Sequence, residues 1–590
     1  MEKNKTSEDS KKILNRRSFI IIIISTFFSL IISLRLFSLQ VVNSKFYKKK
    51  SVENRVSIKL TPPIRGDIYD SKKNLLAGSS SLYEFVVFKN LNKDHLNEIK
   101  ILDDLIKLDL NLNDLSKRLK KYNDYSGFSL SRAKWEQIVK FEKNKFLFSS
   151  IKIIESKKRY YPYKNFSQII GYMGQPINTS DLYPKGVFHI EKSYENHLKG
   201  VPGKIFSEVN AKGKTIREIS IEKSIKGNDL NLTLDLKLQN YAQSLIPKDK
   251  KGSIVVLSVI DGSILSMNSN PTFDAQIFED RESSKIKDFL NDNNKPLFNR
   301  AFSGFYPPGS VFKPISALVG LQRNLINPQT EIFCKGHSSL GDRNYYCWKK
   351  EGHGRVNLKK AIKESCDVYF YELAKNIDID DIFKLSTDLG LNKEYNIGLS
   401  NMGKGLIPSK KWKKAFLDEG WYQGETLITC IGQGFNQTSP LQLATLYSAL
   451  LNGGKYPIPK IDKNYPTKFE GKSLNNEYQK IIINALNAVV QEPRGTAYKL
   501  SISYPDLVKI GGKTGTSQVV RIKESEREDD QYKSKEIEER FKDHSVFVGY
   551  APYSKPKYIA SVIIENGGSG STVAAPIAHR ILDFAFKNNV

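Results

Sequence analysis

The chain has 590 residues, of which 39% are hydrophobic and 26% are charged. This balance is typical of a globular protein and excludes a disordered one, and the length predicts two or three domains. The net charge is +28, but the lysines are scattered and form no compact basic stripe with interleaved aromatic residues, so we expect no nucleic-acid binding.

An apolar run near the N-terminus predicts a membrane anchor. It covers residues 18–39 with one interruption, Arg35, and has about the 20 residues that a helix needs to cross a bilayer. Basic residues precede it, and no A-x-A-like cleavage site follows: Lys3, Lys5, Lys11, Lys12, Arg16 and Arg17. We therefore expect an uncleaved single span rather than a signal peptide, with residues 1–17 in the cytoplasm and everything after residue 40 exported.

Residues 40–230 read as an irregular mixed α/β region without a catalytic constellation. Residues 61–70 are rich in turn signals, residues 101–121 have a helical pattern, and residues 205–209 and 230–234 read as strands.

The composition changes near residue 231, where we expect a second extracytoplasmic domain to begin. Residues 252–258 and 263–267 read as a hairpin around Asp261-Gly262, and a mostly helical middle follows. Later strands are expected at residues 507–520, 545–550 and 558–565, before a closing helix at residues 575–587. This order predicts an α+β domain, with one five-stranded antiparallel sheet and helices packed on both sides.

Three short motifs in this domain could carry chemistry. In Pro307-Pro308-Gly309-Ser310-Val311-Phe312-Lys313, the prolines and glycine favour a helix start near Ser310. Ser310 and Lys313 are three residues apart, so they share a helix face, and a lysine with a lowered pKa can activate a serine hydroxyl. Taken alone, S-x-x-K in a Lys-rich chain is more often a capped helix.

The second motif is Ser365-Cys366-Asp367, in a predicted loop between two helices. Ser365 could relay a proton and Asp367 could bind a lysine or a substrate amide, although a helix N-cap is the simpler interpretation of the triplet alone.

The third motif, Gly511-Gly512-Lys513-Thr514-Gly515-Thr516, lies on a late strand. Lys513 offers a cation and the threonines offer hydroxyls for a carboxylate, while the glycines admit an extended peptide alongside the strand. A phosphate-binding loop is excluded because its upstream glycine is replaced by Leu507.

S-x-x-K, S-x-N and K-T-G in this order are the signature of penicillin-binding proteins and related β-lactamases. The chain resembles class B penicillin-binding proteins over nearly its whole length, with Asp367 where an amide is commoner. His189 replaces the second glycine of the family's G-x-x-G-I-E segment. Further matching segments are residues 65–70, 186–195, 233–239, 299–306, 432–434 and 543–545. Residues 347–354 and the S-C-D motif resemble the elongation-specific branch, with the division-specific branch as the alternative.

The resemblance implies a serine D,D-transpeptidase that cross-links peptidoglycan stem peptides. Ser310 would attack the penultimate D-Ala carbonyl and release the terminal D-Ala, and Lys313 would take the Ser310 proton. Ser365 and Asp367 would pass that proton to the leaving amine. β-Lactams would mimic D-Ala-D-Ala and leave Ser310 acylated.

The K-T-G strand would bind the substrate. The resemblance implies that Lys513 and Thr514 hold the terminal carboxylate. It also implies that Lys513 is a catalytic residue. Gly515 would allow close approach, and the backbone N–H groups of Ser310 and Thr516 would form the oxyanion hole.

Cys334, Cys347, His353 and Cys366 form a candidate metal site, because three thiolates and an imidazole suit tetrahedral zinc. Such a zinc would be structural, and catalysis would need no cofactor. A Cys334–Cys347 disulfide and plain buried thiols are the alternatives. Cys430 reads as a core thiol.

The branch also implies partners and a location: a RodA-type SEDS glycosyltransferase, an MreC-type activator, the inner membrane and a periplasmic catalytic domain. A carboxypeptidase or β-lactamase on the same fold, a penicillin-sensing receptor and a wall scaffold remain alternatives. The charged run at residues 521–540 reads as a solvated loop, and His544 as a residue that orients the strand of Lys513.

Overall fold

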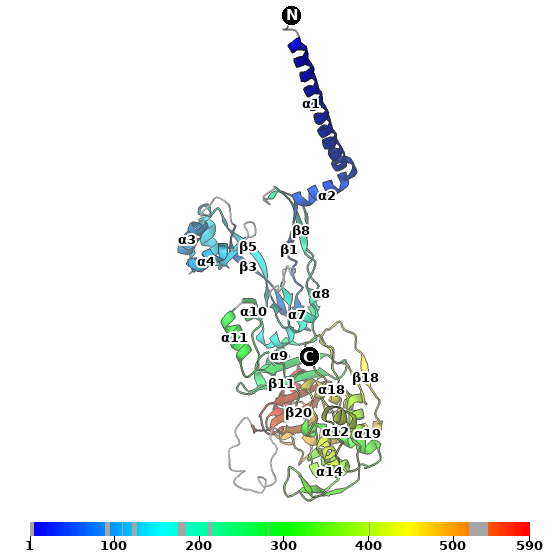
Figure 1. The fold of residues 1–590 in the computed structure, drawn as a ribbon. Coiled ribbons are helices and arrows are strands. Elements are labelled where there is room, and N and C mark those ends of the chain that lie inside the picture. The colour runs from blue at the N-terminus through cyan, green and yellow to red at the C-terminus, as the bar shows by residue number, and fades with distance from the viewer. Residues whose placement is uncertain are drawn as a thin grey trace. The chain divides into compact units, whose positions relative to one another are not determined.

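The fold is described from a computed structural model, in which the chain divides into two compact units (Figure 1). The described residues are 5–88, 95–108, 110–120, 127–174, 184–210, 215–280, 282–400, 402–518 and 541–590. The predicted loop at residues 521–540 therefore lies outside them. One unit comprises Met1–Pro63, Leu82–Ser156 and Val201–Ile225, and the other comprises Ile64–Ser81, Lys157–Gly200 and Lys226–Val590.

The first unit begins with a long apolar helix. Helix α1 (Lys5–Phe37) continues through a π-helical turn, η1 (Ser38–Val42), into α2 (Ser44–Arg55). Within the described chain, residues 16–42 form one helical stretch long and apolar enough to cross a membrane. Its large apolar side chains are exposed all around the helix, as expected for a segment that faces lipid.

A small antiparallel sheet and a separate hydrophobic core complete this unit. Strands β1 (Val56–Thr61), β8 (Gly203–Val209) and β9 (Thr215–Glu222) form an antiparallel sheet. A separate core around Phe85, Leu102 and Phe141 is covered by α3 (His95–Ile106), α4 (Leu112–Lys120) and α5 (Trp135–Lys143). The helical prediction for residues 101–121 is thus confirmed as two helices rather than one.

The second unit is built on a five-stranded antiparallel sheet in the order β12-β11-β21-β20-β19. The strands are β11 (Gly252–Ser258), β12 (Ile264–Asn270), β19 (Gly511–Ser517), β20 (His544–Ala551) and β21 (Tyr558–Ile564). Every residue of β21 is buried, because this central strand is covered on both faces. The predicted sheet is confirmed, with β19 as an edge strand.

Helices cover both faces of this sheet. On one face α9 (Leu236–Leu245) and α23 (Ala574–Lys587) pack together, with the rings of Tyr241 and Phe584 stacked at 4.6 Å. On the other face lie α18 (Pro440–Leu451) and α19 (Asn476–Gln491), with α12 (Lys313–Gln322) beside α19 (Figure 1).

Two predicted strands are shorter than the sequence pattern indicates. Residues 507–510 are irregular, and β19 begins only at Gly511. The backbone N–H of Val508 donates to Asp583 Oδ1 at 2.8 Å, and its carbonyl lies 2.9 Å from His579 Nε2, so side chains of α23 replace a strand partner. Similarly, β10 covers only Leu230–Asn231 instead of residues 230–234.

A buried ion network in the second unit joins Arg65, Arg159 and Glu191. The Glu191 carboxylate is fully buried and accepts hydrogen bonds from Arg65 Nε and Arg159 Nε, both at 2.7 Å. Arg159 Nη1 also donates to the Gly66 carbonyl at 2.8 Å. Burial alone would raise the pKa of Glu191, but the charges of Arg159 and Arg65 outweigh it and hold that pKa below its ordinary value.

His189, which replaces a family glycine, lies beside this network. Its φ of 44° is in the left-handed region that favours glycine. The ring is buried between Phe188 and Phe302, and its Nδ1 accepts a hydrogen bond from the Ser400 backbone at 3.2 Å. Burial lowers the pKa of His189 to about 3, so the ring is neutral at ordinary pH.

We predict that Glu191→Ala lowers the free energy of unfolding by about 3–5 kcal/mol, because it removes the carboxylate that pairs with the buried Arg159 guanidinium, whereas Arg65 keeps an ion pair with Glu195 at 2.8 Å. Chemical denaturation followed by circular dichroism measures the change. The control is Glu331→Ala, which removes an exposed carboxylate 3.6 Å from Arg355 and should cost less than about 1 kcal/mol.

The stabilisation that Glu191 provides through its ion pairs with Arg65 and Arg159 depends on pH in a defined direction. Since the folded-state pKa of Glu191 is lowered, its stabilisation is fully present above the unfolded pKa of about 4.3 and is lost as the pH falls through the folded pKa. Equal losses of stability in Glu191→Ala and Glu331→Ala would contradict this account of the network.

Candidate active site

Ser310 lies in a short helical turn that is pressed against the edge strand. The 3₁₀ turn η4 (Gly309–Phe312) runs directly into α12, so the predicted helix start near Ser310 is confirmed. Gly309 has a φ of 58°, and its N–H donates to the Gly432 carbonyl at 2.8 Å. A Cβ on Gly309 would lie 2.5 Å from the carbonyl oxygen of Thr516. Glycine is therefore needed for this close approach of η4 to β19.

Lys313 is completely buried and points toward the S-C-D turn. Its Nζ donates to Asp367 Oδ1 at 2.7 Å, to the Ser365 carbonyl at 2.9 Å and to Ser365 Oγ at 3.2 Å. Three acceptors compensate for the burial of one ammonium group, and they fix its position one turn after Ser310.

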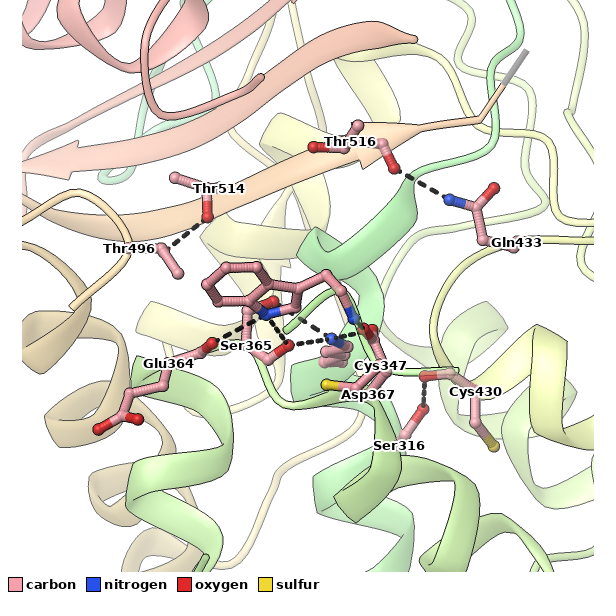
Figure 2. A network of polar contacts seen from close by, with 12 residues as sticks. Ser316, Cys347, Glu364, Ser365, Asp367, Cys430, Gln433, Thr496, Thr514 and Thr516 are labelled. Atoms are coloured by element: carbon pink, nitrogen blue, oxygen red, sulfur yellow. Dashed lines mark hydrogen bonds and ion pairs between the residues drawn. The ribbon is translucent and has the colours of Figure 1, made fainter. Parts of the chain in front are cut away.

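Ser365, labelled in Figure 2, forms hydrogen bonds with both the S-x-x-K and the K-T-G motifs. It has a φ of 57° in the turn between α13 (Leu358–Lys363) and α14 (Asp367–Ala374). Its Oγ also accepts a hydrogen bond from Lys513 Nζ at 2.9 Å. Because two lysines occupy the lone pairs of this oxygen, the hydroxyl proton of Ser365 remains available for donation.

The two lysines cannot both remain fully charged at low cost. Lys513 is buried on β19, and burial first, then the charge of Lys313, holds the pKa of Lys513 well below its ordinary value. The Asp367 carboxylate has the opposite effect and raises the pKa of Lys513. Its own pKa is raised by burial and by Cys347, although Lys313 lowers it, and its Oδ2 accepts a hydrogen bond from the Trp348 N–H at 3.0 Å.

The K-T-G residues line the free edge of the sheet. Thr514 is buried and its Oγ1 lies 2.7 Å from Thr496 Oγ1, whereas Thr516 is exposed and its carbonyl accepts a hydrogen bond from Gln433 Nε2 at 2.9 Å. A Cβ on Gly515 would come within 3.0 Å of the Pro308 carbonyl. An edge strand with small residues can pair with an extended peptide.

The four predicted metal ligands meet in one buried cluster. Cys334 ends β13 (Ile332–Cys334), Cys347 follows β15 (Arg343–Tyr346), and Cys366 precedes α14. Together with His353, their ligand atoms lie within 4.8 Å of one another, and all the cysteines are free. The predicted Cys334–Cys347 disulfide alternative is therefore wrong for this structure.

The geometry of the cluster fits tetrahedral zinc. His353 Nδ1 lies 3.7 Å from Cys334 Sγ and 3.5 Å from Cys347 Sγ. Ordinary Zn–S and Zn–N bond lengths place such ligands about 3.6 Å apart on a tetrahedron. Hydrogen bonds from Cys366 lower the pKa of the Cys334 and Cys347 thiols and raise the pKa of Cys366 itself, so the thiolate is favoured at Cys334 and Cys347. The cluster could therefore hold zinc.

Several residues near the site were not among the predicted site residues. Trp348 was noted only as part of a family segment, yet its indole N–H donates to the Ser365 carbonyl at 3.1 Å. Gln433 likewise appeared only in a matching segment. No sequence motif surrounds Thr496, and only its side-chain contact with Thr514 identifies it as a residue of the site. His544 of β20 pairs with Ser517 of β19, and Cys430 is buried in the core.

Comparisons with known proteins match two regions of the chain. The family described as "Penicillin binding protein transpeptidase domain" matches residues 252–583, and "Penicillin-binding Protein dimerisation domain" matches residues 60–232. Peptidoglycan D,D-transpeptidase MrdA of Haemophilus influenzae is 33% identical, covering 93% of this chain and 88% of that protein.

Solved structures show the same architecture. The chain resembles penicillin-binding protein 2 of Helicobacter pylori in its complex with MreC, with a TM-score of 0.79 and 27% identity over 90% of this chain and 99% of that one. A peptidoglycan synthase complex that coordinates polymerization and crosslinking contains a chain with a TM-score of 0.72 and 25% identity, covering 96% of this chain and 97% of that one.

We predict that Gly309→Ala slows the reaction with a fluorescent penicillin by about 100-fold, because the new Cβ would displace Ser310 from β19 by a fraction of an ångström or more. Gly341→Ala is the matched control, since Gly341 also has a φ of 58° but no described atom lies within 4 Å of its Cβ position. Adduct formation in a gel assay reports both rates. Similar slowing in both variants would mean that backbone strain, and not contact with Thr516, is the cause.

Proposed function

This chain belongs to the MrdA-type class B penicillin-binding proteins, the elongation-specific peptidoglycan D,D-transpeptidases, and from that premise we propose that Ser310 is its acylated nucleophile. The chain is thus a penicillin-binding enzyme of cell-wall synthesis. The observation that carries the proposal for Ser310 is the buried network of Lys313, Ser365 and Lys513, which begins one helical turn after Ser310 and ends on the substrate-binding edge.

In the acylation step, Ser310 Oγ bonds to the penultimate D-Ala carbonyl carbon of a stem peptide. Lys313 takes the hydroxyl proton, and the C–N bond to the terminal D-Ala breaks. Ser365 Oγ, within 3.2 Å of Lys313 Nζ, passes a proton to the leaving amine. Asp367 holds Lys313 in place through their ion pair. An amine of a second stem peptide then attacks the ester and frees Ser310.

The substrate is held by the edge strand. Lys513 and Thr514 bind the terminal carboxylate, Gly515 allows the close approach of the peptide, and the backbone N–H groups of Ser310 and Thr516 stabilise the oxyanion. The free edge of β19 and its small residues support this assignment.

The test of the nucleophile is Ser310→Ala, which should form no covalent adduct with penicillin in intact-mass measurements. Ser316→Ala is the control, because Ser316 lies in α12, which continues from the turn of Ser310, but donates to the Cys430 carbonyl at 2.7 Å. The control should keep the adduct. An adduct on folded Ser310→Ala protein would overturn the assignment, and rapid loss of the adduct from the unmodified chain would indicate hydrolysis in place of transfer.

We also propose a topology and partners. Residues 1–17 are cytoplasmic, residues 18–39 span the inner membrane once, residues 40–230 form a pedestal, and residues 231–590 form the periplasmic transpeptidase domain. A RodA-type glycosyltransferase and an MreC-type activator are the proposed partners. The H. pylori relative in complex with MreC and the synthase-complex relative support this part of the proposal.

The Cys334/Cys347/His353/Cys366 cluster is proposed to bind one structural zinc ion. Cys366 lies between Ser365 and Asp367, and the Cys347-Trp348 segment bonds to Asp367 and Ser365, so these ligands would hold the S-C-D turn in its shape. Zinc would supply a cross-link between chain segments here and would take no part in the acyl transfer.

We predict about one zinc per chain by elemental analysis, in agreement with four protein ligands that fill a tetrahedral site. Cys347→Ser should lose the metal and lower the melting temperature. Cys430→Ser, which alters a buried thiol outside the cluster, should keep the metal. Absence of zinc from protein purified without chelator, or equal zinc in both variants, would refute the site.

A further inference from the structure

Thr496 contacts the K-T-G motif through its side chain and the helix before the S-C-D motif through its backbone. It follows α19, and its backbone N–H donates to the Lys363 carbonyl at 3.2 Å, two residues before Ser365. Its Oγ1 lies 2.7 Å from Thr514 Oγ1, and Figure 2 shows this contact beside the Ser365 turn.

The backbone around Thr496 is held independently of that hydroxyl contact. A Cβ on Gly495 would lie 2.3 Å from the Val489 carbonyl, so the turn packs closely on the end of α19. The adjacent Arg494 has a φ of 68°, and its Nε lies 3.4 Å from Glu364 Oε1. The turn therefore keeps its place without the Thr496–Thr514 hydrogen bond, which leaves the hydroxyl free for another task.

The direction of this hydrogen bond depends on what Thr514 binds. Each hydroxyl has one proton and can both donate and accept. A carboxylate can only accept, so Thr514 must donate its proton to a bound carboxylate. Thr514 Oγ1 can then only accept from Thr496, which makes Thr496 the donor and polarises the Thr514 hydroxyl toward the ligand.

We propose that Thr496 is a positioning residue for carboxylate recognition, which orients the Thr514 hydroxyl toward the terminal carboxylate of the donor peptide or β-lactam. The inference rests on the proposed role of Thr514. Thr496 does not touch the substrate, and it acts on the free-acid group alone, not on the acyl transfer at Ser310.

The experiment compares two ligands that differ only at that group, a penicillin and its carboxyl methyl ester. Second-order rate constants for acylation are measured for the full chain in detergent and for Thr496→Val, Thr496→Ser, Thr514→Val and Thr387→Val. Valine keeps the shape of threonine and removes the hydroxyl. Thr387 is the matched control, since its half-buried hydroxyl donates to the Phe383 carbonyl one helical turn back, away from the site.

Thr496→Val should lower the rate for the free acid by about 3- to 10-fold, the usual effect of one hydrogen bond, and leave the rate for the ester unchanged. Thr496→Ser should restore the preference for the acid. Thr387→Val should change neither rate. Equal slowing of acid and ester in Thr496→Val would show a merely structural role, and an unchanged preference would show no role; either result overturns the inference.

Thr514→Val separates this inference from the proposed function. If Thr514→Val loses the preference for the acid while Thr496→Val keeps it, the inference alone fails. If Thr514→Val keeps the preference, the proposed carboxylate contact of Thr514 fails, and the inference fails with it.

Discussion

Two buried lysines that share one serine hydroxyl are the interaction on which this active site depends. Lys313 and Lys513 both donate to Ser365 Oγ, at 3.2 and 2.9 Å. Two ammonium groups cannot be buried side by side without compensation, so the site needs the Asp367 carboxylate, the Ser365 carbonyl and a lowered pKa at Lys513. This constraint buries the proposed proton-transfer path, which begins one helical turn after Ser310.

The rest of the catalytic domain holds the three chain segments of this network at the correct distance. Gly309 brings η4 against β19, because any side chain there would meet the Thr516 carbonyl. The left-handed conformation of Ser365 turns its hydroxyl toward both lysines while its neighbours begin and end helices. The edge position of β19 leaves one side of the strand open to a peptide, and the other side is fixed by β20.

The Cys/His cluster and the Thr496 turn support the same network from two sides. The cluster includes Cys366 and, through the Trp348 N–H, reaches Asp367. The turn bonds to the Lys363 carbonyl and to Thr514. The cluster thus includes a residue of the S-C-D turn, and the Thr496 turn bonds to the helix that leads into it. Disturbing either one should therefore alter the geometry of proton transfer or carboxylate binding before it unfolds the sheet.

The sequence by itself determined the order of the motifs, the apolar N-terminal helix, the β11–β12 hairpin and the candidate zinc ligands, because these depend on local patterns and residue types. The sequence pattern predicted a strand from residue 507, but β19 begins only at Gly511. Val508 instead bonds to side chains of α23, which no local pattern reveals. Only the tertiary structure decided which groups meet. Ser365 and Lys513 are 148 residues apart, and Thr496 is recognisable only by its contact with Thr514. Contacts over such separations follow from the packing of helices on the sheet, which a pattern of neighbouring residues does not encode.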